Sequence, residues 1–204
     1  MKNNLTIGLF LSLTTAFSAC SPATDRNTQK GQTDSISSRV DNAMERNIDA
    51  VRQQGIQVAD ANFISNAAGG SKMEIEVSKI ALSKASSAQV KEFAKMMVDD
   101  HTKAYQSLKQ LTDRKDVRLP DNLSELDTKK ISTITKNEGK DFDREYMLTM
   151  VKDHKVMSEL FQSQIQNGYD SLLKAYASQT LPTILHHLKM AEKINDSMEN
   201  KAAN

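Results

Sequence analysis

Two ten-residue stretches of the chain repeat each other, and both carry side chains that can bind a metal. Residues 92–101 and 145–154 align without a gap, and glutamate, an aromatic residue, methionine, valine, aspartate and histidine recur at the same offsets. Each copy places a methionine four positions before a histidine, giving Met97 with His101 and Met150 with His154. On a helix this spacing puts the thioether and the imidazole on one face. Two such helices can present metal ligands to the core of a helical bundle.

Two further residues extend this candidate site. His187 lies near the middle of the last apolar segment, and we expect Glu76 to point inward between Met73 and Ile80. Each long helix would then contribute a ligand-capable side chain at a similar depth, as a buried metal site in a bundle requires. His186 is expected at the surface. The predicted metal-binding residues are Glu76, His101, His154, His187, Met97 and Met150.

The alternative interpretation of these residues is structural. Histidines in a bundle core can be neutral and hydrogen-bonded, and methionines at helical spacing commonly fill a core. Asp100 and Asp153 each lie about 100° around the helix from the adjacent histidine, so neither can easily orient that imidazole. They would then be solvated charges, or would pair with a lysine on the same or a neighbouring helix.

The ligand types narrow the choice of metal and of chemistry. Thioether sulfur favours Cu(I), whereas imidazole suits zinc and Cu(II), so copper and zinc are both candidates. A ferritin-type di-iron site uses a Glu-x-x-His motif, but the residue three positions before each of His101, His154 and His187 is valine or isoleucine. Di-iron chemistry is therefore disfavoured. The sequence also lacks a Gly-x-Ser-x-Gly motif and a glycine-rich phosphate loop, so we predict no catalytic residues.

The composition indicates helices as the elements that carry these residues. Glycine (7) and proline (3) are scarce in 204 residues, which favours an all-α fold. Apolar residues recur at helical spacing in four long segments, and their packing predicts an up-down-up-down bundle. A short helix is expected between the second and third long helices. The expected helices are about 60–85, 88–115, 124–135, 142–166 and 171–198. A net charge of +1 argues against nucleic-acid binding.

The first residues have the pattern of an export signal. Lys2 precedes a short apolar run that is too short to span a membrane. The run ends in small residues before Cys20, the only cysteine, as in a bacterial lipoprotein signal; the alternative is an ordinary signal peptide cleaved after Ala19. We expect Cys20 to carry lipid and to hold the protein at a membrane, with the outer membrane of the cell envelope as its location. The predicted segments are a signal peptide (1–19), a tether with an amphipathic stripe (20–59), the bundle (60–199) and a tail (200–204).

Several motifs between about residues 61 and 198 resemble one family of bacterial exported proteins. They occur in order at residues 63–70, 74–76, 97–104, 142–147, 150–154 and 181–188. The chain is similar here to the family of the domain of unknown function 4142. That resemblance implies a ferritin-like four-helix bundle that is secreted or attached to the outer membrane. It implies no assigned activity.

Together these patterns predict a non-catalytic, membrane-anchored envelope lipoprotein that binds a ligand or partner. A metal held by histidine, methionine and glutamate in the bundle core is one candidate for that ligand, and a protein or another small ligand is the other. The alternative is a metal-dependent redox or metal-storage protein of ferritin-like descent. Metal analysis of the purified domain would separate these two interpretations.

Overall fold

The computed structural model describes residues 56–202, which form five helices and contain no strand. The expected all-helical fold is thus confirmed for this part of the chain. The predicted signal peptide, Cys20 and almost all of the 20–59 tether lie outside the described residues. None of the helices within 56–202 is both long enough and apolar enough to span a membrane. The helices are α2 (Val58–Lys84), α3 (Ala88–Asp113), α4 (Glu125–Thr135), α5 (Gly139–Asn167) and α6 (Ser171–Ala202).

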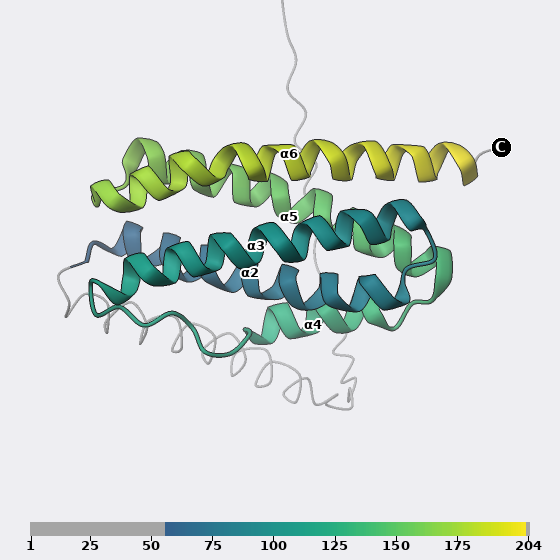
Figure 1. Ribbon diagram of the computed structural model, residues 1–204, viewed down its shortest axis with the longest axis horizontal. Helices are drawn as coiled ribbons and strands as arrows, with labels where there is room; N and C mark the ends of the chain where they lie inside the picture. The colour runs from purple at the N-terminus through teal and green to yellow at the C-terminus, as the bar shows by residue number, and fades with distance from the viewer. Residues whose placement is uncertain (1–55, 203–204) are drawn as a thin grey trace, which may run out of the picture. The chain divides into compact units, whose positions relative to one another are not determined.

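The four long helices pack as two antiparallel pairs (Figure 1). Helix α2 pairs with α3, and α5 pairs with α6, through the short connections at 85–87 and 168–170. The two pairs meet through contacts of α2 with α5 and of α3 with α6, while the short helix α4 lies against α2 and α5. Helix α6 continues through Pro182.

The order of helix directions differs from the prediction. The connection from α3 to α5 follows α2 along its length, since Lys72 donates to the carbonyl of Pro120 at 3.2 Å and Lys84 pairs with Glu138 at 2.7 Å. Helix α5 therefore starts at the end of the bundle where α3 also starts, and the two helices run in the same direction (Figure 1). The predicted up-down-up-down order is wrong, because the α4 segment carries the chain back across the whole bundle. The observed order is up, down, down, up.

Two buried aspartates join the helices at opposite ends of the bundle. Asp143 of α5 accepts hydrogen bonds from the backbone amides of Ser86 and Ser87, at 3.0 and 2.8 Å, directly before α3 begins. At the other end, Asp60 of α2 accepts from the Gln164 side chain at 2.7 Å and from the amides that precede α6. An anionic side chain is favourable at a helix N-terminus, where the backbone amides lack partners. Both aspartates thus fix helix starts.

The apolar core consists of two clusters. The Phe93 cluster includes Met73, Val77, Phe93, Met97, Tyr146, Met150 and Ile194. The Phe63 cluster includes Phe63, Ala67, Leu108, Phe161, Leu173, Tyr176 and Ile184. On α3, α5 and α6 a histidine lies in the sequence between the residues of one cluster and those of the other. The core is therefore interrupted by a polar layer, and this layer contains the candidate site.

Candidate metal centre

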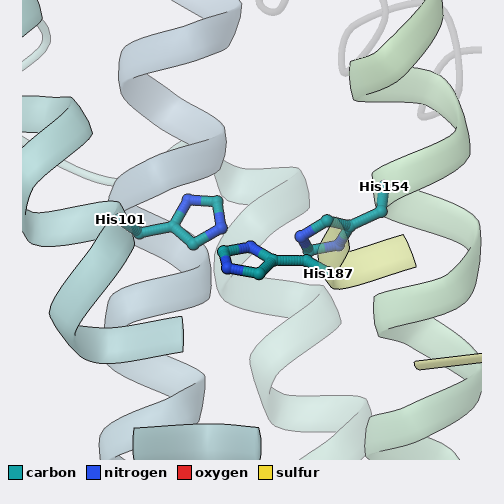
Figure 2. A group of neighbouring side chains, drawn as sticks. All are labelled: His101, His154 and His187. Carbon is teal, nitrogen blue, oxygen red and sulfur yellow. The ribbon is translucent and has the colours of Figure 1, made fainter. Parts of the chain in front are cut away.

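His101 of α3, His154 of α5 and His187 of α6 converge in the polar layer between the two clusters (Figure 2). They expose 6%, 0% and 1% of their surface. One ring nitrogen from each histidine lies within 4.8 Å of the chosen nitrogens of the other two. The three ring centroids are 5.3–5.6 Å apart. Three helices thus deliver imidazoles to one point, as the spacing in the sequence predicted.

Hydrogen bonds fix the tautomers of two of these imidazoles. Nδ1 of His154 lies 2.9 Å from the backbone carbonyl of Met150, which can only accept, so this nitrogen carries the proton. Nε2 of His187 lies 3.2 Å from Oδ2 of Asp100 and donates to it. In a neutral imidazole the second nitrogen then has a free lone pair. These nitrogens, Nε2 of His154 and Nδ1 of His187, are buried and find no hydrogen-bond partner among the described residues.

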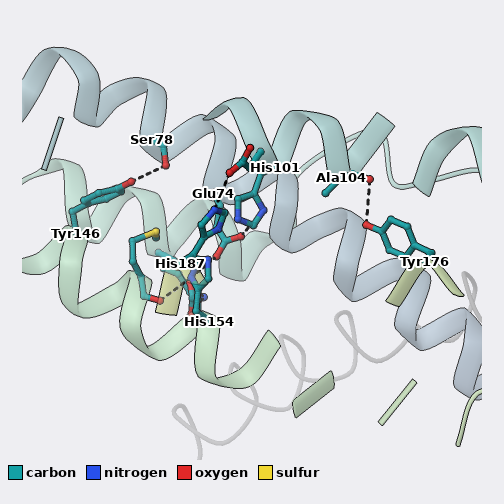
Figure 3. Close-up of polar contacts among 12 residues, drawn as sticks. Glu74, Ser78, His101, Ala104, Tyr146, His154, Tyr176 and His187 are labelled. Atoms are coloured by element: carbon teal, nitrogen blue, oxygen red, sulfur yellow. Dashed lines mark hydrogen bonds and ion pairs between the residues drawn. The ribbon is translucent and has the colours of Figure 1, made fainter. Parts of the chain in front are cut away.

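Glu74 of α2 lies beside His101 and His154 (Figure 3). Its Oε2 is 3.1 Å from Nδ1 of His101, and its Oε1 is 3.3 Å from Nδ1 of His154. The carboxyl group exposes only 1% of its surface. Neither oxygen takes part in an aligned hydrogen bond within the described part of the chain, and the same holds for both nitrogens of His101. Buried polar groups without partners are costly and uncommon in native proteins, so this cluster calls for a functional explanation.

Burial controls the ionisation of the layer. It lowers the pKa of His154 to about 3, and it lowers the pKa of His101 and of His187 as well, with the neighbouring imidazoles adding to the effect on His101 and His154. Burial, followed by the charge of Asp153, raises the pKa of Glu74 well above its usual range. Although burial opposes it, contact with His187 and Lys103 lowers the pKa of Asp100. At neutral pH the three imidazoles are therefore uncharged, which is the form that binds metals.

A small cavity adjoins the three histidines. It is lined by all three imidazoles and by residues on the Phe63 side of the layer, including Ser71, Met157 and Tyr176. Its volume is about 10 Å³, counted as the space that the centre of a water molecule can occupy. By that measure, roughly 10–15 Å³ holds one water molecule. The imidazole cluster thus borders a space that is large enough for about one water molecule.

Gly70 of α2 leaves room for Met157, one of the cavity-lining side chains. A Cβ atom at Gly70 would lie 3.3 Å from the terminal methyl group and 3.4 Å from the sulfur of Met157. Glycine at this position therefore lets Met157 of α5 approach α2 closely.

The expected position of Glu76 is wrong. This residue is exposed by 53% and pairs with Lys79 on the surface of α2. The buried acid of α2 is Glu74, one position after Met73 in the sequence. Helix α2 contacts α3, α4 and α5, so its buried face is wider than a single apolar stripe and includes Glu74.

The two methionines of the repeat are buried in the Phe93 cluster. Met97 and Met150 have no exposed surface, and neither is among the residues that line the cavity. Their role as ligands stays a prediction. His186 is exposed, as expected. The two aspartates of the repeat differ from each other: Asp153 pairs with Lys130 of α4 at 2.8 Å, whereas Asp100 reaches His187.

Sequence reasoning missed Glu74 and the contact of Asp100 with His187. The signal for Glu74 was available, because it is an acid next to the buried Met73 and shares one turn of helix with it. The Asp100 contact joins two helices that are far apart in the sequence, and no spacing within one helix could reveal it.

Comparisons with known proteins agree with this fold. A model of the family described as "Domain of unknown function (DUF4142)" matches residues 46–194. The crystal structure of a DUF305 fragment from Deinococcus radiodurans is similar, with a TM-score of 0.62 at 9% sequence identity, over 70% of this chain and 98% of that one. Such low identity supports the shared helical fold alone. No curated protein matches the chain.

Proposed function

The chain belongs to the DUF4142 family, and we propose that this member binds one zinc or copper ion through His101, His154 and His187. The observation that carries this proposal is the set of buried ring nitrogens that lack a partner. Leucine or phenylalanine at these three positions would give a more stable core, because an unsatisfied buried polar atom costs roughly 1–3 kcal/mol. A metal bound by the three lone pairs removes that cost.

The groups behind the imidazoles resemble the outer ligands of metal sites. Histidine ligands usually donate their second ring N–H to a carboxylate or a backbone carbonyl, which fixes the tautomer and raises the basicity of the ligating nitrogen. Asp100 plays this part for His187, and the carbonyl of Met150 plays it for His154. An ionised Glu74 would accept from Nδ1 of His101 and leave Nε2 as the ligand.

The charge of the layer also suits a divalent cation. Three neutral imidazoles contribute no charge, and burial raises the pKa of Glu74, which favours its uncharged form. When a dication binds, ionisation of Glu74 supplies a buried negative charge next to it. Metal binding should therefore release a proton, as it does wherever a ligand or its partner must lose one.

Three imidazoles are typical ligands of zinc and copper. Zinc sites with three protein ligands include three-histidine sites, and imidazole also suits copper. Copper would gain a preference if Met97 or Met150 turned its sulfur to the ion. The absence of a Glu-x-x-His motif from the sequence continues to disfavour di-iron chemistry.

Metal titration combined with thermal melting tests the proposal. At a free metal concentration of about 100 times Kd, binding should stabilise the folded chain by ~2.7 kcal/mol. The His101→Ala/His154→Ala double variant should lose this response, whereas His186→Ala, which changes the exposed neighbour of His187, should keep it. If neither zinc nor copper shifts the melt, or if the double variant responds like the parent, the histidines are only core residues.

We further propose that the protein is a non-catalytic envelope lipoprotein attached to a membrane through lipid on Cys20. The support is the signal-like segment before Cys20 in the sequence. Cys20→Ala should leave the chain unprocessed or release it from the membrane fraction. Unchanged processing and fractionation of this variant would remove the lipoprotein proposal.

A ferritin-like arrangement is the finer description that we propose for the fold. The single long crossover between α3 and α5 supports it, because ferritin-like bundles have one such connection. The alternative function, metal storage or metal-dependent redox chemistry, predicts several ions per chain or a change of oxidation state on turnover. A stoichiometry of one ion per chain would favour simple binding over storage.

A further inference from the structure

We infer that the metal site keeps one coordination position open to the adjoining cavity, where a single exchangeable water molecule, hydroxide ion or small monodentate anion binds. This inference rests on the proposed function, since it concerns the fourth ligand of the same ion. An open coordination position is typical of a reactive or sensing site, because structural zinc sites are closed by four protein ligands.

The first observation is the number of protein ligands. The described residues contain one group of histidine, cysteine, aspartate and glutamate side chains that could hold an ion, and it consists of three histidines. Glu74 is not a member of that group. Its oxygens approach Nδ1 of His101 and of His154, on the opposite edge of each ring from Nε2. Three protein ligands leave a fourth position, which is where zinc sites of this type hold water or substrate.

The second observation is the position of the cavity. His101, His154 and His187 all line it, so the space adjoins the imidazole cluster. On the opposite side the Phe93 cluster packs tightly, with no exposed surface at Met97 or Tyr146 and 1% at Phe93. A non-protein ligand can therefore reach the ion from the Phe63 side only.

The third observation is the chemistry of the cavity wall. Ala104 and Thr183 keep the side chains near the imidazoles short, whereas Phe161 and Tyr176 bound the space with rings. The hydroxyl group of Tyr176 is already committed, because it donates to the carbonyl of Ala104 at 3.2 Å. Burial raises the pKa of Tyr176 to about 12, so its ring adds no charge. No lysine or arginine lines this cavity.

Size and polarity together define the ligand class. A space that holds about one water molecule excludes carboxylic acids, phosphates and sugars as ligands of the ion. The wall has no lysine or arginine and includes the carboxyl group of Asp100, so the metal itself would be the cationic group that an anion meets there. The fitting ligands are water, hydroxide and small anions such as azide that attach through one atom.

Water-proton relaxation of the Cu(II)-loaded chain tests this inference. Copper stoichiometry is measured first, so that a failure of metal binding is separated from a closed coordination sphere. A coordinated, exchanging water should raise the relaxation rate of bulk water above that of a chain whose copper has no such ligand. Azide should lower the rate again as it displaces the water, and should produce a new charge-transfer absorption band.

Two cavity-filling variants sharpen the test. Ala104→Leu on α3 and Thr183→Leu on α6 should each keep one bound copper but lose the excess relaxation and the azide band. Ser107→Leu is the matched control, because Ser107 is exposed on the same helix as Ala104. If one filling variant fails to fold, the other carries the test from a different wall.

Each remaining outcome overturns the inference. Copper bound without excess relaxation in the parent chain would mean that the ion is closed to solvent. Equal relaxation in the parent and in both filling variants would mean that the ligand does not occupy this cavity. If no copper binds through the histidines, the proposed function and this inference fail together.

Discussion

Asp143 and Glu74 are both buried carboxyl groups, exposed by 2% and 1%, but they have opposite surroundings. Asp143, at one end of the bundle, receives two backbone amides and the hydroxyl group of Ser86. Glu74, in the middle, receives no hydrogen bond from the described residues and faces two neutral histidines. The first arrangement stabilises a helix start. The second costs stability, which is the reason we propose that an ion binds there.

Asp60 extends the comparison to the other end of the bundle. It receives the Gln164 side chain and the amides of Tyr169 and Asp170, all within 3.0 Å. Both aspartates therefore have several donors, whereas the buried side-chain atoms without a partner in the described part of the chain belong to Glu74 and the three histidines, with Oδ1 of Asn195 as the exception. Energetically costly features such as unsatisfied buried groups concentrate at functional sites, and well-packed regions elsewhere compensate for their cost. Four predictions test this division.

The largest effect should come from pH, because protonation of the histidines in the central layer opposes folding. Burial lowers the pKa of His154 to about 3 from 6.5, so below pH 6.5 the unfolded chain takes up a proton that the folded chain refuses. His101 and His187 act in the same direction. The metal-free protein should therefore lose several kcal/mol of stability as pH falls from about 6.5 to about 3, at ~1.4 kcal/mol per unit of pKa shift.

Glu74 should act in the opposite direction. Its folded pKa is raised, so its contribution to stability is present below the unfolded value of about 4.5 and is lost as pH rises through the folded pKa. Urea unfolding at a series of pH values measures both limbs. His154→Gln should flatten the acid limb, and Glu74→Gln should flatten the other. A stability that stays constant between pH 6.5 and 4.5 would contradict the burial of neutral imidazoles.

The next largest effect concerns the packed region beside the layer. Phe161 contacts Phe63 edge-to-face, with 4.9 Å between ring centroids, and exposes 2% of its surface. Phe161→Ala should reduce the free energy of unfolding by ~3–5 kcal/mol, as truncation of a core aromatic residue does. Denaturant unfolding measures the change. A loss under about 0.5 kcal/mol would place Phe161 at the surface.

The two carboxyl groups should respond differently to isosteric replacement. Asp143→Asn places an amide NH2 group, which cannot accept a hydrogen bond, next to backbone N–H donors. The free energy of unfolding of the metal-free protein should fall by roughly 1.5–3 kcal/mol, as on loss of hydrogen bonds to a charged group. Glu74→Gln breaks no aligned hydrogen bond, so at neutral pH it should cost nothing or stabilise the protein. Equal losses in both variants would remove the distinction between the ends and the middle.

The smallest of the four effects is on metal affinity. Glu74→Gln and Asp100→Asn leave the three imidazoles in place but weaken the groups that orient them. Each should lower metal affinity about 10–100-fold, the usual cost of changing an outer partner of a ligand. Asp99→Asn is the control, because Asp99 is on the same helix as Asp100 and pairs with Lys95 at the surface. Calorimetric titration gives all three values, and an Asp99→Asn loss equal to the others would point to net charge as the cause.

The sequence predicted the helices and the histidines because both depend on local periodicity. The repeat around His101 and His154 placed each imidazole on the inner face of its helix, and one histidine on α6 completed the set. We expected Glu76 in the core, but the buried acid is Glu74, since the width of the buried face of α2 depends on how many helices pack against it. The directions of the helices were predicted in error for a related reason, because the crossover through α4 is set by tertiary contacts such as those of Lys72 and Lys84.

X-ray absorption by the zinc-loaded chain can show whether His101, His154 and His187 hold one ion together. We predict one zinc per chain with three imidazole nitrogens at about 2.0–2.1 Å and one further light atom, in a tetrahedral site. The imidazole signal should disappear in the His101→Ala/His154→Ala double variant. A shell made only of oxygen, or a shell with fewer than three imidazoles in the parent chain, would contradict the claim that His101, His154 and His187 hold the ion together.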